Sequence, residues 1–226
     1  MSLMPRSNND LTSYGLFFKT DKAYWHQYTD AYYRYFSKIR YNKNNILEIG
    51  IGSDNAPSIN MLSRFFDNST IFAVDTIPSF VSNANLVNNV NAFICDSSNK
   101  YRLLTTFNKI QFDLIIDDGS HIASHQQNAF ECLFPMLKNN GIFICEDVHP
   151  SGSIHNNLMI SYFNNHHLKS QYKSIEIVHR KAKALRCYDC KKLNTENVGM
   201  CSCGISLLPS NDDSISIIIV KNDSTC

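Results

Sequence analysis

The sequence predicts an α/β fold in which a mainly parallel sheet carries helices on both faces. Residues 112–149 have the pattern of a buried strand, a helix and a second buried strand. A unit of this length is a right-handed crossover between parallel strands. Three further apolar runs, at 45–49, 71–75 and 91–96, each contain or end in an acidic residue. Two strand-like runs near the C-terminus, 174–179 and 214–221, are expected to form an antiparallel hairpin at one edge of the sheet.

Composition limits the class of protein. The 226 residues suit one α/β domain with a small appendage, and the apolar fraction of 43% is enough for a globular core. The formal net charge of +1 indicates neither a nucleic-acid partner nor an anionic membrane. No run approaches the ~20 apolar residues of a membrane span, and the N-terminus lacks the apolar core of a signal peptide. We therefore expect a cytoplasmic protein in a reducing compartment.

The chain divides into residues 1–42, an N-terminal leader and cap helix, and residues 43–226, the main domain. Residues up to about Gly15 have the pattern of a loose leader. Beyond them, Tyr28, Tyr32 and Tyr35 follow helical spacing, and we expect this helix to cover one end of the sheet.

A polar and aromatic segment, residues 20–26, precedes that helix. It contains Thr20, Asp21 and Lys22, followed by Trp25 and His26. One interpretation is a capped helix start with ordinary core aromatics. The other is a lid over a functional site.

The first strand, near residues 45–49, runs into a glycine turn. Gly50 and Gly52 would let backbone N–H groups approach a ligand closely. Pro57 suits the first turn of the helix that follows. The third glycine of the dinucleotide fingerprint is absent, because Asn55 stands there, which argues against a NAD-dependent enzyme.

Two aspartates end the next two strands. Asp75 lies about 20 residues beyond the glycine turn, where an acid is placed to accept hydrogen bonds from ribose hydroxyls. Asp96 ends the third strand. A turn role is the alternative for each, but ligands of open α/β sheets bind at this edge.

The central unit carries the most specific pattern. Residues 114–116 form an apolar run, and Ser124 with Gln127 forms a capping-box signature for the helix. Phe130, Leu133 and Leu137 then repeat at helical spacing. The residues 139–141, Asn-Asn-Gly, are expected to stop the helix before the apolar run 142–145.

Acidic residues follow both strands of this unit: Asp117, Asp118, Glu146 and Asp147. If the strands are neighbours, the carboxylates crowd at one edge and repel one another unless a cation joins them. Hard oxygen ligands with no nearby cysteine suit Mg²⁺ or Mn²⁺. His121 adds a titratable base beside the acids. The plain alternative is a turn cap and solvated carboxylates.

A cysteine-rich insert occupies residues 185–205. Two close pairs there suggest a tetrahedral zinc site, with reduced thiols in a surface loop as the alternative. The four residues are Cys187, Cys190, Cys201 and Cys203. The role of three further histidines stays open: His155, His166 and His167.

Assembled, the pattern resembles the Rossmann-like class I S-adenosylmethionine-dependent methyltransferases. The stretches IIDDGSH, HQQNAFECLFPMLKNNG and EDVH closely resemble the metal-dependent sugar O-methyltransferases of macrolide biosynthesis and the related cephalosporin-hydroxylase-like methyltransferases. TDKAYWHQY is similar to the N-terminal segment of that family. The resemblance covers roughly residues 20–151. The chain departs from the family after the glycine turn, at residues 53–55, and in the cysteine-rich insert.

The resemblance implies a metal-dependent O-methyltransferase acting on a sugar or glycan-like hydroxyl. It implies Mg²⁺ ligands at Asp118, Glu146 and Asp147, and a base at His121 that accepts the hydroxyl proton. It also implies a set of residues that bind S-adenosylmethionine: Glu48, Gly50, Gly52, Asp75, Asp96 and Asp117. Members of the family often associate, so a homo-oligomer is expected.

Two other classes of function remain open. One is a catechol or phenol O-methyltransferase, since these enzymes also chelate a diol on Mg²⁺. The other is a non-catalytic binding protein that uses a zinc-stabilised loop as its interaction surface. A panel of acceptors separates the first from a sugar enzyme, and binding of S-adenosylmethionine separates the second.

Overall fold

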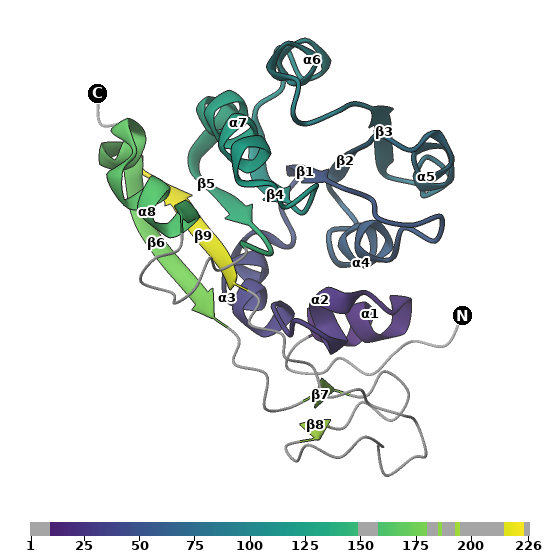
Figure 1. Ribbon diagram of the computed structural model, residues 1–226. Coiled ribbons are helices and arrows are strands. Elements are labelled where there is room, and N and C mark those ends of the chain that lie inside the picture. The colour runs from purple at the N-terminus through teal and green to yellow at the C-terminus, as the bar shows by residue number, and fades with distance from the viewer. Residues whose placement is uncertain (1–9, 149–157, 180–184, 187–192, 195–214, 224–226) are drawn as a thin grey trace.

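The computed structural model describes residues 10–148, 158–179, 185–186, 193–194 and 215–223. A seven-stranded sheet runs through its centre in the order β3-β2-β1-β4-β5-β9-β6 (Figure 1). These strands are β1 (Asn45–Ile49), β2 (Thr70–Asp75), β3 (Val90–Ile94), β4 (Phe112–Asp117), β5 (Leu137–Cys145), β6 (Tyr172–His179) and β9 (Ile215–Lys221). The first five are parallel, and β9 is antiparallel to both β5 and β6. The predicted parallel sheet with an antiparallel C-terminal edge is therefore confirmed.

Helices cover both faces of the sheet (Figure 1). One core cluster joins the sheet to α1 (Asp10–Phe18), α3 (Thr29–Ile39), α4 (Pro57–Phe65) and α5 (Pro78–Ala84). A second cluster joins the opposite face to α6 (Lys100–Thr106), α7 (Ala123–Leu133) and α8 (Leu158–Asn165). The remaining short elements are α2 (Asp21–Tyr24), η1 (Phe134–Met136), η3 (His167–Gln171) and the paired strands β7 (Leu185–Arg186) and β8 (Leu193–Asn194).

The two clusters explain why the middle of strand β4 is apolar. Leu114 and Ile116 lie in the first cluster, while Ile115 between them lies in the second. Successive side chains of a strand point to opposite faces, so a strand covered on both sides carries mostly apolar residues in its middle. Its polar residues are left to the strand ends, which is where the site lies.

The N-terminal segment is more ordered than a loose leader. Helix α1 begins at Asp10, and Leu11, Gly15 and Leu16 are buried in it. A Cβ atom on Gly15 would lie 2.5 Å from the Cβ of Ala23, so α1 and α2 pack with almost no space between them. The expectation for residues 10–15 was wrong because the sequence pattern does not show this tertiary contact. The proposed boundary between residues 1–42 and 43–226 stays a prediction.

Both ends of the central helix, α7, differ from the expectation. The capping box does not form, since α7 begins at Ala123 and its N-cap, Ile122, makes no side-chain hydrogen bond. The helix ends at Leu133, and Leu137 already belongs to β5. Pro135 follows within the 3₁₀ turn, and its missing N–H and ring prevent the helix from continuing.

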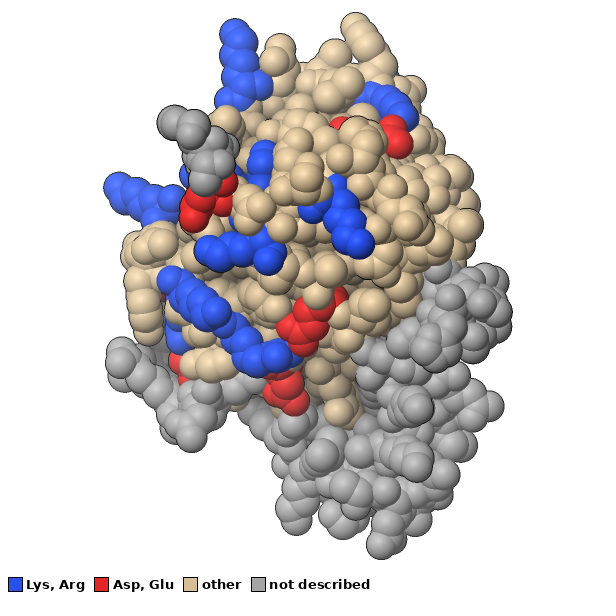
Figure 2. All heavy atoms as spheres, turned by 90° about the vertical axis from the view of Figure 1, so that its left-hand side faces the viewer, with Lys and Arg blue, Asp and Glu red and all other residues tan. Residues whose placement is uncertain are grey.

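Surface charges are mixed around the β6 edge, where Lys and Arg side chains lie near acidic ones (Figure 2). Arg34, for example, is 59% exposed and pairs with Glu176 of β6. Such exposed pairs contribute about 0–1 kcal/mol. Charges with larger consequences are therefore those that are buried.

Two predicted features, the zinc site of the cysteine-rich insert and the role of His155, concern residues that the structure does not describe. The cysteines of the insert, Cys187, Cys190, Cys201 and Cys203, lie outside the described residues, as does His155. Among the described residues, no helix is long and apolar enough to span a membrane.

Candidate active site

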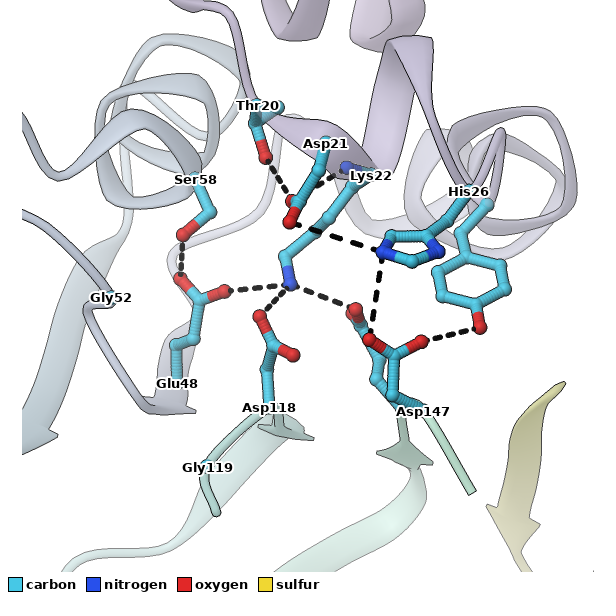
Figure 3. Close-up of polar contacts among 12 residues, drawn as sticks. Thr20, Asp21, Lys22, His26, Glu48, Gly52, Ser58, Asp118, Gly119 and Asp147 are labelled. Carbon is cyan, nitrogen blue, oxygen red and sulfur yellow. Dashed lines mark hydrogen bonds and ion pairs between the residues drawn. The ribbon is translucent and has the colours of Figure 1, made fainter. Parts of the chain in front are cut away.

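Three neighbouring parallel strands end at one edge of the sheet with acidic side chains. β4 lies between β1 and β5, and Asp117 pairs with Ile49 on one side and Cys145 on the other. This register brings Asp118 and the Glu146-Asp147 pair, which follow β4 and β5, to the same edge beside Glu48 of β1 (Figure 3). We call this group of carboxylates the acidic edge. The expectation that two adjacent strands deliver these acids together is confirmed.

A buried lysine lies among the acids. The Lys22 side chain of α2 is 1% exposed, and its Nζ atom donates hydrogen bonds to Asp118 Oδ2 and, at 2.8 Å, to Glu146 Oε2. Glu48 Oε1 lies 3.4 Å from the same nitrogen. One ammonium group therefore contacts a carboxylate from each of three adjacent strands (Figure 3).

Burial and charge shift the pKa values of these groups. Burial alone would lower the pKa of Lys22, but Asp118, Glu146 and Glu48 raise it well above its ordinary value, so the amine is charged. Burial raises the pKa of Glu48 to about 7, although Lys22 opposes the shift. The pKa of Glu146 is raised for the same reason. These carboxylates depend on the ammonium group for their charged form.

Three side chains beside this lysine converge as metal ligands would. Asp118, His121 and Asp147 each place one donor atom within 4.8 Å of the others. The Nε2 atom of His121 lies 3.9 Å from Asp118 Oδ1, the oxygen that Lys22 does not bind. Two carboxylates and an imidazole are a donor set suited to Mn²⁺ or, with added water oxygens, Mg²⁺.

The backbone at this group is held in an uncommon conformation. His121 has a φ of 56° and Asp147 a φ of 47°, both in the left-handed region. Non-glycine residues there cost free energy, and such strain gathers at functional sites. Both residues belong to the set that converges with Asp118.

The segment that holds Asp147 comes from the N-terminus. Tyr28 donates a hydrogen bond of 2.8 Å to Asp147 Oδ1, and His26 Nε2 lies 3.5 Å from Asp147 Oδ2 (Figure 3). Together with Lys22, these residues place the segment 20–28 directly over the acidic edge. The lid interpretation of that segment stays a prediction, because Tyr28 is at the same time a buried residue of the first core cluster.

Glu146 stands slightly apart from the three converging groups. Its Oε2 atom binds Lys22, and its Oε1 atom is buried with no hydrogen-bond partner among the described residues. It does not reach the set formed by Asp118, His121 and Asp147 in this arrangement. Its role as a metal ligand stays a prediction that requires its carboxyl group to turn.

A pocket of about 220 Å³ opens beside the acidic edge. Four of the residues expected to bind the cofactor line it: Gly50, Gly52, Asp75 and Asp96. Asp118, Gly119 and Ser120 form its other wall. Gly50 has a φ of 92°, and a Cβ atom there would overlap the carbonyl oxygen of Asp118. Only glycine lets the turn after β1 approach the turn after β4 this closely.

Asp75 also organises the glycine turn. Its Oδ2 atom accepts a hydrogen bond of 2.8 Å from the backbone N–H of Ile51 and one of 3.3 Å from that of Gly52. Its Oδ1 atom accepts from the N–H of Ile77 at 2.9 Å. Each carboxylate oxygen has lone pairs left for a ligand in the pocket.

Two residues expected to bind the cofactor are buried and do not line the pocket. Glu48 is 0% exposed, and its Oε2 atom accepts a hydrogen bond from Ser58 of α4. Asp117 is 2% exposed, and burial raises its pKa to about 7. Both are absent from the pocket lining, so their cofactor-binding role stays a prediction.

Sequence reasoning did not assign a site role to Lys22, His26 or Tyr28. They lie about 100 residues from the acids they contact, and no local pattern indicates such a contact. The available signal was the polar and aromatic character of residues 20–26. The histidines of the other predicted cluster, His166 and His167, lie at α8 and η3, away from this group.

Comparisons with known proteins agree with the fold. Residues 47–148 match the model of a family described as a methyltransferase domain. A tetracenomycin-C 3'-O-methyltransferase of Streptomyces olivaceus, named for its 2-methoxy-rhamnosyl substrate, is 33% identical over 129 residues, which are 55% of this chain and 33% of that protein. Demethylmacrocin O-methyltransferase of Streptomyces fradiae is 31% identical over 145 residues, 62% of this chain and 36% of that protein.

A solved structure shows the shared fold over most of the chain. The MycE methyltransferase in complex with Mg, SAH and mycinamycin VI superposes with a TM-score of 0.66 and 20% identity, covering 95% of this chain and 55% of that one. The chain spans about a third of the length of the curated relatives it matches.

Proposed function

We propose that this chain, whose residues 47–148 match the model of a methyltransferase domain family and whose fold is that of the class I methyltransferases, is a metal-dependent O-methyltransferase. The methyl donor is S-adenosylmethionine, and the acceptor is a hydroxyl group of a sugar or glycoside. The names of the matched relatives, which are sugar O-methyltransferases, support this class of acceptor.

One observation carries the proposal: Asp118 belongs to two features at once. It lines the pocket beside Gly50 and Gly52, and it also converges with His121 and Asp147. A donor in the pocket and an acceptor at the three converging groups would meet at this residue. Methyl transfer needs this proximity, because its two reactants must be held in line.

In this assignment, the pocket residues hold the donor. Asp75 is placed to accept hydrogen bonds from ribose hydroxyls, and Asp96 borders the far end of the pocket. The glycine turn presents backbone N–H groups without the bulk of side chains.

The converging groups act on the acceptor. When bound, a divalent ion supplies Lewis acidity that eases loss of the hydroxyl proton. His121 accepts that proton, and Asp118 orients the imidazole from 3.9 Å. The acceptor oxygen forms a bond to the methyl carbon while the carbon–sulfur bond breaks. Sulfur keeps the electron pair, which gives S-adenosylhomocysteine.

The test is methyl transfer from labelled S-adenosylmethionine to a panel of rhamnosides, other glycosides and catechols, using the full chain. We expect transfer to a glycoside that stops in excess EDTA and returns when Mg²⁺ or Mn²⁺ is restored. Preference for a catechol would support the phenol class instead. Transfer that is indifferent to EDTA, or no binding of S-adenosylmethionine by calorimetry, would contradict the proposal.

Replacing Asp75 by asparagine tests the donor end of the pocket. A hydrogen bond to a charged group contributes about 1.5–3 kcal/mol, so the affinity for S-adenosylmethionine is expected to fall about tenfold to a hundredfold. Isothermal titration calorimetry measures the affinity. Asp54→Asn is the matched control, because Asp54 lies on the same turn and bonds only to Asn83 in the described residues. Equal affinities for the two variants would remove Asp75 from the donor site.

Three finer assignments remain proposals. The cysteine-rich insert binds zinc through Cys187, Cys190, Cys201 and Cys203. The protein associates into a homo-oligomer, with no nucleic-acid or membrane partner. It acts in the cytoplasm, as expected of an enzyme that draws on S-adenosylmethionine.

A further inference from the structure

The acidic edge has two cation positions, and they share one residue. The first is formed by Glu48, Asp118 and Glu146 around the ammonium group of Lys22 (Figure 3). The second is formed by Asp118, His121 and Asp147. Asp118 gives Oδ2 to the first position and turns Oδ1 toward His121 in the second.

The first position is enclosed except at Asp118, whose side chain is 23% exposed. Glu48, Glu146 and Lys22 are each at most 1% exposed. The Oε1 atoms of both glutamates are buried with no hydrogen-bond partner among the described residues. Buried carboxylates with so few donors need a nearby positive charge, and Lys22 is the cation that the described structure places among them.

The lysine is held in place by its own segment. Asp21 Oδ1 accepts a hydrogen bond of 2.8 Å from the backbone N–H of Lys22, at the start of α2. Helix α2 in turn packs closely on Gly15 of α1 through Ala23. The ammonium group therefore reaches the acidic edge from a fixed direction. A flexible lysine on the surface would not be held in this way.

We propose that Lys22 is a positioning residue that serves as a built-in counter-cation. It fills the position formed by Glu48, Asp118 and Glu146, and it confines any exchangeable divalent ion to the side of Asp118 that faces Asp147. Only the identity of that second ion rests on the proposed function.

A direct consequence follows for a protein without this lysine. Without the ammonium group, the buried carboxylates of Glu48 and Glu146 and the partly exposed carboxylate of Asp118 would surround a gap with no cation. The oxygen ligands and their spacing suit a divalent ion, which would then enter the first position. A lysine with a purely packing role would have no such effect.

The test counts bound ions. Lys22→Met keeps the length of the side chain and removes its charge, and Mn²⁺ titration followed by electron paramagnetic resonance gives the number of ions bound per chain. We expect Lys22→Met to bind one ion more than the wild type, and to gain more thermal stability from Mn²⁺. Lys138→Met is the matched control, since Lys138 pairs with Asp113 in a partly buried contact near the opposite ends of the strands, and it should bind the wild-type number.

The result is independent of whether the protein transfers methyl groups. A wild type that binds no ion would count against the proposed function, while one extra ion in Lys22→Met would still support the role of Lys22. Equal numbers of ions in Lys22→Met and the wild type would overturn it.

A second variant covers the case in which Lys22→Met folds only poorly. The triple variant Lys22→Met, Glu48→Gln, Glu146→Gln removes two negative charges with the positive one. We expect it to recover folded structure by circular dichroism without a divalent ion, and to bind no more ions than the wild type. If the triple variant is no better folded than Lys22→Met, the lysine acts through packing and the proposal fails.

Discussion

Asp118→Asn is expected to lower the rate of methyl transfer by about a hundredfold to a thousandfold, the cost of removing one electrostatic stabiliser from an enclosed site. Asparagine keeps the size of the side chain but loses its charge. The change therefore weakens the metal position and the contact with Lys22 together. It leaves the pocket wall formed by the backbone of the same turn.

The measurement pairs initial rates with Mn²⁺ binding. We expect the affinity for Mn²⁺ to fall with the rate, while S-adenosylmethionine binds with nearly its wild-type affinity. Glu131→Gln is the control, because Glu131 makes an exposed ion pair with Lys100 on α6, outside the acidic edge. An Asp118→Asn enzyme with wild-type rate and metal affinity would show that the converging groups are not the reaction centre.

The position of Asp118 illustrates what the sequence could predict. An apolar run that ends in acids, a helix, and a second such run indicate adjacent parallel strands through local patterns and the handedness of crossovers. The acids must then meet at the carboxyl edge, whatever the details of packing. The structure agrees, with Asp117 paired to Cys145. The same reasoning placed Gly50, Gly52, Asp75 and Asp96 at the pocket.

The position of Lys22 could not be predicted by the same reasoning. A lysine near a helix start has the pattern of a solvated residue, and burial of lysine is rare. Its environment is set by the packing of α1 and α2 onto the rest of the chain, which joins residues 96 and 124 positions apart. Glu48 and Asp117 are a related case: their position at a strand end was correct, but the direction of each side chain depends on the partners available around it.

His121→Ala is expected to slow methyl transfer by about 10²–10⁴-fold, the usual contribution of a positioned general base. The imidazole is 28% exposed and lies 3.9 Å from Asp118 Oδ1, at the open side of the acidic edge. Its left-handed backbone, with a φ of 56°, shows that the chain accepts strain to hold the ring there. We expect imidazole added to the buffer to restore part of the lost rate.

Mn²⁺ binding decides between the two roles open to this ring. As a base, His121 can be removed while Asp118 and Asp147 keep the ion, so the rate falls and the affinity for Mn²⁺ changes little. As a ligand, its loss would lower rate and affinity together, and the proton would need another acceptor. His167→Ala, an exposed histidine of η3, is the matched control and should retain both properties. Because Asp118 and Asp147 each keep a carboxylate oxygen for the ion when the ring is removed, we expect the first result.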